Sequence, residues 1–385
     1  MIIKKNQKLS SSRQKGVTLI ELMIALALSM FVLLAVTTVY ISTKRTYNYQ
    51  ETIVQLQENA RYAITTLASD LREAGYAGCN PSVNNLLDPA GTGANAYNPQ
   101  AGVEGWEYTA TPTGPGDVPV FASSTNIGAD ADWTGFGATP LNSLLSASVV
   151  QGTDVIAITS ASTREDLIPN PAPATSASIV VNKAHGIDDS AIVIVSDCAK
   201  GDMFQHRAGG GGAVALNRPA AGNPGNINPA NWVQAITSDM RIQTVNSFMY
   251  FIGVNPAGEP ALFRADFSFG TTAVTPDEIA PGVENMQILY GEDLTNDSNF
   301  MPDRYVTADA ITNPDNVVTV RISLLMRTPG DLDRDAPAVA QTFPMLSNTA
   351  TSTTVSYPPD LRARRVFTST IFLRNKGLYR ERIGT

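Results

Sequence analysis

The chain has 385 residues, 43% of them apolar, and a formal net charge of −8. A chain of this length and composition can bury at least one sizeable hydrophobic core, which excludes disorder of the whole chain. Its acidic balance disfavours contact with the phosphate backbone of DNA or RNA, so we expect no direct nucleic-acid partner.

The first 16 residues form a short basic segment without acidic residues. Its five positive charges are Lys4, Lys5, Lys8, Arg13 and Lys15. Because basic residues ahead of an apolar segment stay in the cytoplasm, we predict that residues 1–16 are a cytoplasmic leader. Loss of this leader would remove five positive charges and lower the net charge from −8 to −13.

Residues 17–41 form one apolar run of 25 residues whose only charged side chain is Glu21. As a helix this run would extend about 37 Å, enough to cross a hydrocarbon layer of about 30 Å. An ordinary secretory signal carries small residues at a cleavage site behind the apolar run, and residues 40–44 do not supply a good site. The run is therefore either an uncleaved membrane anchor or a signal that is cut on its cytoplasmic side.

Glu21 helps to decide between these two interpretations. An ionised carboxylate in hydrocarbon costs several kcal/mol unless it is paired, which makes Glu21 a candidate functional residue. If the chain is cut after Gly16, the freed α-amine of Val17 can pair with Glu21 of a neighbouring subunit. Such a pair would neutralise both charges and fix the axial register between subunits.

The helical pattern continues past the membrane segment, because no Pro or Gly occurs between residues 17 and 74. Residues 42–75 are amphipathic and end at Gly75, a usual helix terminator. The apolar stripe consists of Ile53, Leu56, Ala60, Ile64, Leu67 and Leu71. We expect it to face the core of the chain's own exported domain or, alternatively, neighbouring subunits.

Residues 76–385 change to short β-rich runs separated by Gly, Pro, Asn and Ser, which predicts a mostly β head domain and an α+β protein overall. The strand candidates are residues 154–159, 178–181, 191–196, 248–253, 286–290, 317–326 and 366–373. Two stretches, near 81–142 and 208–232, are too long for simple connections, and we interpret them as insertions that are either functional surface or mobile.

The only two cysteines are Cys79 and Cys198, and both lie in the part that we expect to be exported. An exported chain with two cysteines favours one disulfide. The alternative is a pair of unpaired buried thiols.

Other polar clusters do not form a convincing catalytic, cofactor or metal site. Asp331, Asp333 and Asp335 alternate as in a calcium loop, but Ala336 and Thr342 occupy the positions of its glycine and bidentate glutamate. We interpret Asp293, Asn296, Asp297 and Asn299 as a capped turn, and His185 and His206 as surface residues. We therefore expect no enzyme, no cofactor and no metal.

The C-terminal part of the chain is basic. Its cations are Arg362, Arg364, Arg365, Arg374, Lys376, Arg380 and Arg382. We favour a strand with a solvated or salt-bridged face, and the alternatives are a docking face for an acidic neighbour and a contribution to DNA capture.

The run from Lys15 to Glu21, followed at once by the apolar helix, resembles the class III signal of type IV prepilins. The resemblance implies that a prepilin peptidase cleaves between Gly16 and Val17 and methylates the Val17 amine. It also implies that Glu21 serves in methylation or assembly. Val17 departs from the Phe that is usual at this position of the family.

Four sequence segments resemble the PilW family of type IV minor pilins. They lie within residues 59–79, 193–204, 282–305 and 362–375. The resemblance implies a subunit that is held in the inner membrane with its N-terminus in the cytoplasm and its head in the periplasm, and that then joins a pilus at the cell surface. Its implied partners are the major pilin, other minor pilins near the filament tip and a tip adhesin.

Two alternatives share some of these features. A minor pseudopilin of a type II secretion system has the same signal and the same helix. A membrane-anchored periplasmic binding or enzymatic domain would keep its N-terminus uncleaved.

Overall fold

The structure is a computed structural model that describes residues 16–79, 83–89, 97, 102–109, 132–136, 148–227, 231–268, 275–295, 300–332, 339–347 and 352–376. The chain divides into two compact units, Met1–Thr52 and Ile53–Thr385. Each unit is described below by itself.

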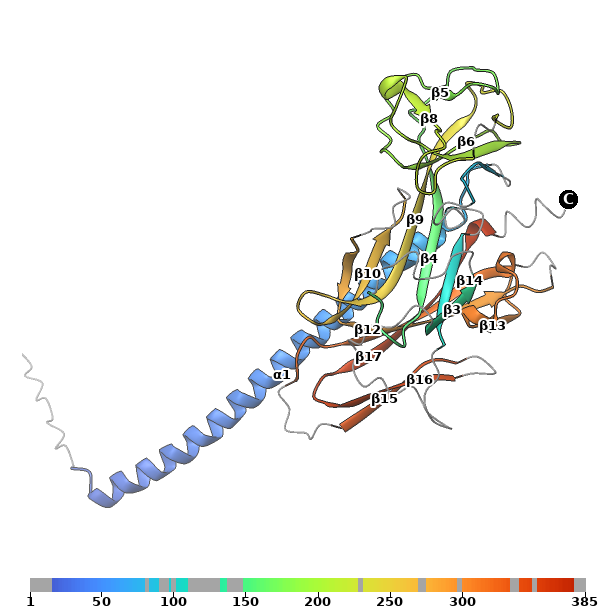
Figure 1. Cartoon of the computed structure of the whole chain (residues 1–385). Coiled ribbons are helices and arrows are strands. Elements are labelled where there is room, and N and C mark those ends of the chain that lie inside the picture. Colours follow the sequence, from blue (N-terminus) through green and yellow to red (C-terminus); the bar gives the residue numbers. More distant parts are fainter. Residues whose placement is uncertain are drawn as a thin grey trace, which may run out of the picture. The chain divides into compact units, whose positions relative to one another are not determined.

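One long helix, α1 (Leu19–Glu73), contains 55 residues and passes through the boundary between the units (Figure 1). Its length follows from the absence of Gly and Pro inside it. The helix ends where the sequence predicts, since Gly75 has a left-handed φ of +79° that other residues rarely adopt.

The second unit is mostly β, which confirms the predicted fold class. Its strands are β1 (Asn84–Asn85), β2 (Val103–Tyr108), β3 (Trp133–Phe136), β4 (Val155–Thr163), β5 (Ser178–Val180), β6 (Ile192–Ser196), β7 (Gly201–Gln205), β8 (Ala215–Asn217), β9 (Arg241–Val254), β10 (Pro260–Asp266), β11 (Asp277–Pro281), β12 (Val283–Glu292), β13 (Arg304–Val306), β14 (Val317–Arg327), β15 (Val339–Ser347), β16 (Ser352–Asp360) and β17 (Arg364–Phe372). Short 3₁₀ helices lie at Gly212–Val214, Ala308–Ala310 and Pro314–Asn316. All seven strand candidates lie on observed strands.

Two sheets organise this unit. The larger has nine strands, with β1-β7-β6-β9-β4-β2-β3 in order and β10 and β11 added beside β9. The smaller has four strands in the order β13-β12-β14-β17, all antiparallel, and the β15-β16 hairpin contributes Met345 and Val355 to a small core with Leu325 of β14.

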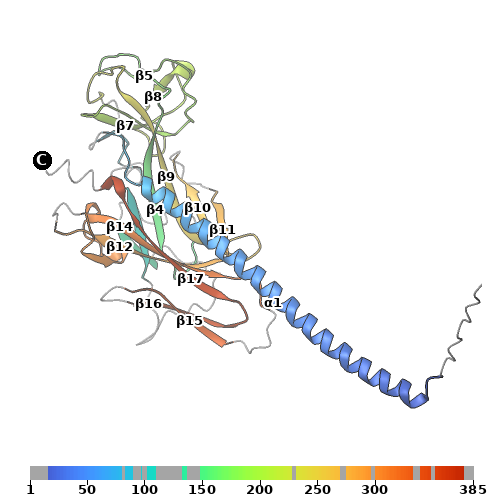
Figure 2. The same cartoon turned by 180° about the vertical axis from the view of Figure 1, so that it is seen from behind.

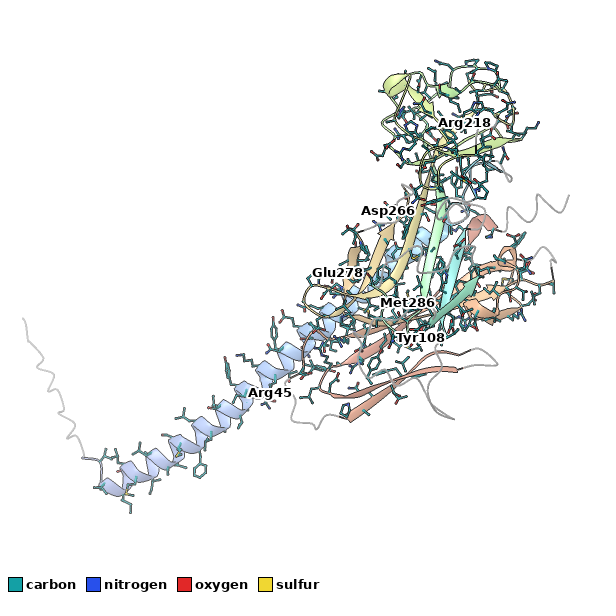
Figure 3. All side chains as sticks on the ribbon, in the orientation of Figure 1. Arg45, Tyr108, Arg218, Asp266, Glu278 and Met286 are labelled. Atoms are coloured by element: carbon teal, nitrogen blue, oxygen red, sulfur yellow. A yellow bond between two sulfur atoms is a disulfide. The ribbon has the colours of Figure 1, made fainter. Side chains whose placement is uncertain are left out.

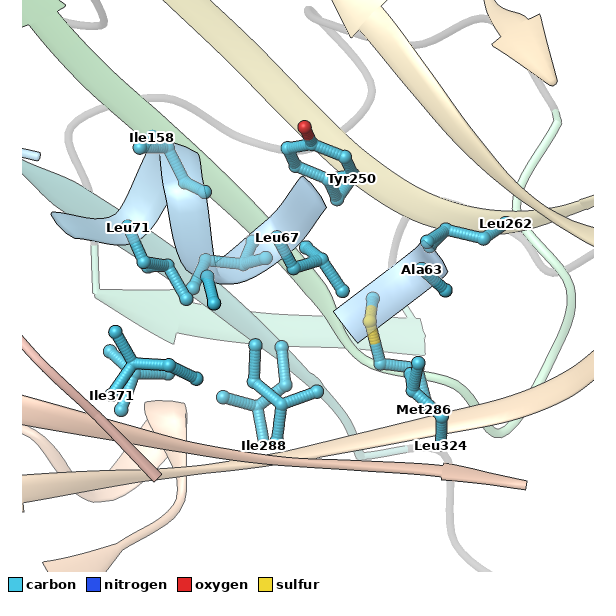
Figure 4. Packing of buried hydrophobic residues seen from close by; sticks show 14 of the residues in the cluster. Ala63, Leu67, Leu71, Ile158, Tyr250, Leu262, Met286, Ile288, Leu324 and Ile371 are labelled. Carbon is cyan, nitrogen blue, oxygen red and sulfur yellow. The ribbon is translucent and has the colours of Figure 1, made fainter. Parts of the chain in front are cut away.

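The second half of α1 lies between these two sheets. Its buried residues Ala63, Leu67 and Leu71 face Ile158, Tyr250 and Leu262 of the larger sheet on one side, and Met286, Ile288, Leu324 and Ile371 of the smaller sheet on the other (Figure 4). The view from behind shows the helix crossing the strands of the larger sheet (Figure 2). The predicted stripe therefore packs into the chain's own core, with Leu56, Ala60, Leu67 and Leu71 at most 3% exposed.

A separate small core surrounds the two-stranded sheet of β5 and β8, which we call the β5–β8 lobe. Strand β9 connects this lobe to the main core, because Ile242 belongs to the lobe core and Tyr250 to the main core (Figure 1). Leu216 and Trp232 of the stretch 208–232 are buried in the lobe. The described parts of the stretch 81–142 include β1, β2 and β3, which join the larger sheet.

Candidate functional site

The amino-terminal end of α1 begins just behind the predicted cleavage site. Gly16 and Val17 lie before the helix, and Leu19 is the first helical residue. The hydroxyl oxygen Oγ1 of Thr18 accepts a hydrogen bond from the backbone N–H of Glu21 at 3.3 Å, which is the N-cap arrangement. The peptide between Gly16 and Val17 therefore lies outside the helix.

Glu21 lies in the first turn of α1, three residues behind the Thr18 cap. The positive end of the helix dipole favours a carboxylate at this position. A Thr followed three residues later by Glu is also the spacing of a capping box, a signal by which the sequence could have identified the role of Thr18.

The first part of α1 presents apolar side chains on all its faces. From Leu19, which is 78% exposed, to Ile41, which is 45% exposed, the large apolar residues have no core to cover them in this unit. Within the described part of the chain, α1 is the one helix long and apolar enough to cross a membrane. Hydroxyl groups inside the run donate to carbonyls of the preceding turn, as Ser29 does to Ala25 at 2.7 Å and Thr37 to Leu33 at 2.7 Å. Such bonds reduce the cost of placing hydroxyls in lipid.

The other end of α1 is fixed by contacts with distant segments. Asn375 donates from Nδ2 to the carbonyl oxygens of Glu73 at 3.2 Å and Ala74 at 3.0 Å. It therefore caps carbonyl groups at the helix end that have no hydrogen-bond partner within the helix. Cys79 and Cys198 form a disulfide with their Cα atoms 4.9 Å apart. The disulfide expectation is therefore confirmed, and it connects the helix end to the β6-β7 turn.

A cleft of about 490 Å³ lies beside this helix end. It is lined by charges of both signs, Arg72 and Arg374 against Glu73 and Glu165, together with Tyr76. A lining rich in charged side chains of both signs is unlike the mostly apolar lining of a typical small-molecule pocket.

His185 and His206 were expected at the surface, and this expectation is wrong. Both are buried, and their rings meet edge to face with centroids 4.8 Å apart. Each Nδ1 accepts a backbone N–H, from Ile187 at 3.0 Å and from Asn217 at 3.1 Å. Burial lowers the pKa of both imidazoles, and the neighbouring His185 lowers that of His206 further.

A second buried polar group lies between the two sheets. Asp154 is 2% exposed and accepts the N–H of Ile288 at 2.7 Å, and it shares a hydrogen bond with the Glu107 carboxyl. Burial raises the pKa of Asp154 to about 7. It also raises the pKa of Glu107, with a further contribution from the charge of Asp154. The buried hydroxyl of Tyr290 lies within electrostatic reach of both carboxyls.

The candidate metal ligands are only partly within the described residues. Asp331 lies 4.0 Å from Arg362, whereas Asp333 and Asp335 lie outside the described residues. In the predicted turn, Asp293 is buried and Asp303 accepts the N–H of Leu294 at 2.7 Å, while residues 296–299 lie outside the described residues. Among the described residues, no group of three or more His, Cys, Asp or Glu is placed to hold a metal ion.

The basic C-terminal part is largely salt-bridged where the structure describes it. Arg364 lies 2.5 Å from Glu284 and 2.6 Å from Asp360, and Arg362 lies 2.8 Å from Glu259. Lys376 is buried, and its Nζ lies 3.5 Å from Oδ1 of Asp315. These contacts confirm the salt-bridged interpretation for these three cations, whereas Arg380 and Arg382 lie outside the described residues.

Comparison with known protein families gives matches in two regions of the chain. Residues 249–375 match the family model PilW, described as type IV pilus-assembly protein W, and residues 11–37 match the prokaryotic N-terminal methylation motif. These two matches support a type IV pilus-related pilin. No curated protein and no solved structure gives a significant match.

The PilW match begins within β9 and ends at Asn375, the residue that caps α1, so it includes the whole four-stranded sheet. Of the four sequence segments that resemble PilW, those in 282–305 and 362–375 lie inside the match, and those in 59–79 and 193–204 lie outside it. The methylation motif covers Gly16, Val17 and Glu21 and implies a substrate of prepilin peptidase. The apolar helix and this signal together fit a membrane-anchored pilin.

Proposed function

We propose that the chain is a minor pilin, cleaved by prepilin peptidase between Gly16 and Val17 and incorporated into a type IV pilus. It would join other minor pilins and the major pilin, prime assembly near the filament tip and support a tip adhesin. Before assembly it would lie in the inner membrane with residues 1–16 in the cytoplasm. Val17 would be N-methylated, and Glu21 would pair with the Val17 amine of a neighbouring subunit.

The observation that carries this proposal is the combination of the methylation motif with one uninterrupted helix. The apolar half of α1 has no covering core, whereas its second half is buried between two sheets of the second unit, and the smaller of these sheets lies within the PilW match. A helix that is half covered needs lipid or neighbouring helices for the rest, which membranes and pilus-type filaments both supply.

A minor pseudopilin of a type II secretion system is the second candidate. It is favoured by the same motif and helix, and disfavoured by the PilW match over about a third of the chain. A membrane-anchored binding or enzymatic domain is the third, and we disfavour it because PilW is described as a pilus-assembly family.

The decisive experiment is mass spectrometry of the N-terminal peptide from sheared filaments and from inner membranes. A protease that cuts after Glu would release Val17 to Glu21 from the processed chain and Met1 to Glu21 from the precursor, because no acidic residue precedes Glu21. Val17 that carries one methyl group in sheared filaments supports the minor pilin. Processed chain confined to membranes favours the pseudopilin, and an intact Met1 in every fraction contradicts both.

A further inference from the structure

A cluster of aromatic and cationic residues follows the apolar run of α1. Within residues 40–49 the chain places three of its 12 tyrosines, at Tyr40, Tyr47 and Tyr49, and the first cations behind the leader, Lys44 and Arg45. Tyr40 is 66% exposed, Tyr47 65% and Tyr49 47%. No acidic residue lies between positions 22 and 50, so this cluster is purely aromatic and basic.

The helix geometry gathers these side chains into two adjacent rows. Tyr40, Lys44 and Tyr47 are spaced by four and three residues and therefore share one face of α1, while Arg45 and Tyr49 are spaced by four on the neighbouring face. Side chains project from this part of the helix, where Arg45 is labelled (Figure 3). Long cationic side chains reach along a helix to the polar layer of a membrane, and tyrosine rings prefer that layer because they have an apolar body and a polar tip.

Other polar groups near the boundary are bonded within the helix. Thr38 donates to the carbonyl of Ala35 at 2.8 Å, and Thr46 donates to that of Ser42 at 2.9 Å. These hydroxyls therefore carry little preference for one depth in a membrane. The strong preference for the polar layer comes from the tyrosines and the cations.

We propose that Tyr40, Lys44, Arg45, Tyr47 and Tyr49 form an interfacial belt that binds the phosphate and glycerol layer of phospholipid headgroups at the outer face of the inner membrane. The belt sets the depth of α1 in the bilayer before the subunit leaves it. Its partner is the lipid surface, and the contact does not require that the chain be a pilin.

The belt has a consequence at the opposite face of the membrane. Glu21 precedes Tyr40 by 19 residues, which is about 28 Å of helix, against a hydrocarbon layer of about 30 Å. A belt at the outer headgroups therefore places Glu21 at the cytoplasmic edge of the hydrocarbon, where water and headgroups can solvate its carboxylate. The bond between Gly16 and Val17 then lies within reach of an enzyme that acts at the cytoplasmic face, and this step rests on the proposed function.

The test measures the depth of one labelled position in the full-length chain. Ser42→Cys provides a single free thiol for a nitroxide label, since the native cysteines form a disulfide. The labelled precursor is placed in vesicles of phosphatidylcholine with a minority of phosphatidylglycerol, and depth is read from collisions with oxygen and with a water-soluble nickel complex. The combined variant Tyr40→Ala, Lys44→Ala, Tyr47→Ala lengthens the apolar run, so we expect the label to move deeper by about one helical turn, ~5 Å.

The matched control is Tyr62→Ala, because Tyr62 is also on α1 and 58% exposed but lies outside the belt. We expect this control to leave the depth unchanged. An unchanged depth in the combined variant, or an equal shift in the control, overturns the proposal. Cleavage of the wild-type chain by prepilin peptidase in the same vesicles separates the two claims. If the combined variant shifts in depth but the wild-type chain is not cleaved, only the proposed function is refuted. If the wild-type chain is cleaved but the variant does not shift, only the belt is refuted.

Discussion

The phenolic oxygen of Tyr250 lies 2.5 Å from Oδ2 of Asp70, so the long strand β9 is hydrogen-bonded to the last turns of α1. Tyr250 is fully buried in the main core, and the Asp70 side chain is 20% exposed. Arg264 of the neighbouring strand β10 lies 3.9 Å from the same carboxylate. The helix is thus held to the larger sheet by a directional bond in addition to apolar packing.

Replacement of this bond should measurably weaken the second unit. Tyr250→Phe keeps the ring and removes the donor, and we expect it to lower the free energy of unfolding by about 1–2 kcal/mol, as for a hydrogen bond to a partly solvated charged group. Denaturant unfolding of the detergent-solubilised chain measures this loss. Tyr62→Phe on the exposed face of α1 is the control and should change nothing, and equal stability of both variants would contradict the role of the bond.

Glu21 is expected to act in assembly and not in membrane insertion. Glu21→Gln removes the charge and keeps the size, so the chain should still insert and be cleaved, whereas its amount in sheared filaments should fall about tenfold or more. Immunoblots of membranes and sheared filaments compare the two pools. Normal recovery of the variant in filaments would show that no charge pair is needed.

Asp154 should make the second unit less stable as the pH rises. Its ordinary pKa is about 3.9, and burial raises the folded value to about 7, so the native state binds more protons than the unfolded state between these values. The free energy of unfolding therefore falls across this window, by a magnitude on the order of a few kcal/mol. The acidic groups within reach are Glu107 and Asp309.

Asp154→Asn retains an oxygen that can accept the Ile288 N–H and removes the titration. Unfolding curves of this variant should lose much of the fall between about pH 4 and about pH 7. Asp239→Asn, at an exposed acid, serves as the control and should keep the wild-type pH profile. Parallel profiles for wild type and Asp154→Asn would count against this assignment.

His185 and His206 should make the β5–β8 lobe less stable as the pH falls, which is opposite to the effect of Asp154. The folded pKa values are lowered, so below about pH 6.5 the unfolded state takes up protons that the native lobe excludes, and stability is lost as the pH falls. Amide exchange of β5 and β8, corrected for its intrinsic rate, should reveal more opening near pH 5 than at about pH 7. His206→Asn keeps an acceptor for the Asn217 N–H and should reduce this pH dependence, even where it lowers stability overall.

The disulfide should contribute substantially to the stability of the second unit. It links residues 119 positions apart, and the chain-entropy model gives up to about 5 kcal/mol for a loop of this length. The double variant Cys79→Ser, Cys198→Ser should therefore unfold at lower denaturant concentration than the wild type. A reductant should bring the wild type close to the variant and leave the variant unchanged, and insensitivity of the wild type would contradict the prediction.

Strands with continuous apolar runs could be predicted from the sequence, as at residues 192–195, because local composition and burial agree there. Strands β2 and β3 could not, since Gly105 and Gly135 weaken the local signal. A Cβ at Gly105 would lie 2.0 Å from the hydroxyl of Tyr290, so the glycine is explained by a side chain from the other sheet. The contact between His185 and His206 also depends on residues distant in the sequence. Because 21 residues separate the two histidines along the chain, only the packing of the lobe brings them together.

The sequence by itself determined the membrane helix, its end at Gly75, the processing motif around Gly16, Val17 and Glu21, and the mostly β character of the rest. These features depend on charge, apolar length and backbone preference, which act between residues close in the chain. Only the tertiary structure decided that α1 is enclosed between two sheets, that Tyr250 binds Asp70, and that His185 and Asp154 are buried. Those properties arise from contacts between distant segments, where desolvation and partner geometry are set by the fold and not by neighbouring residues.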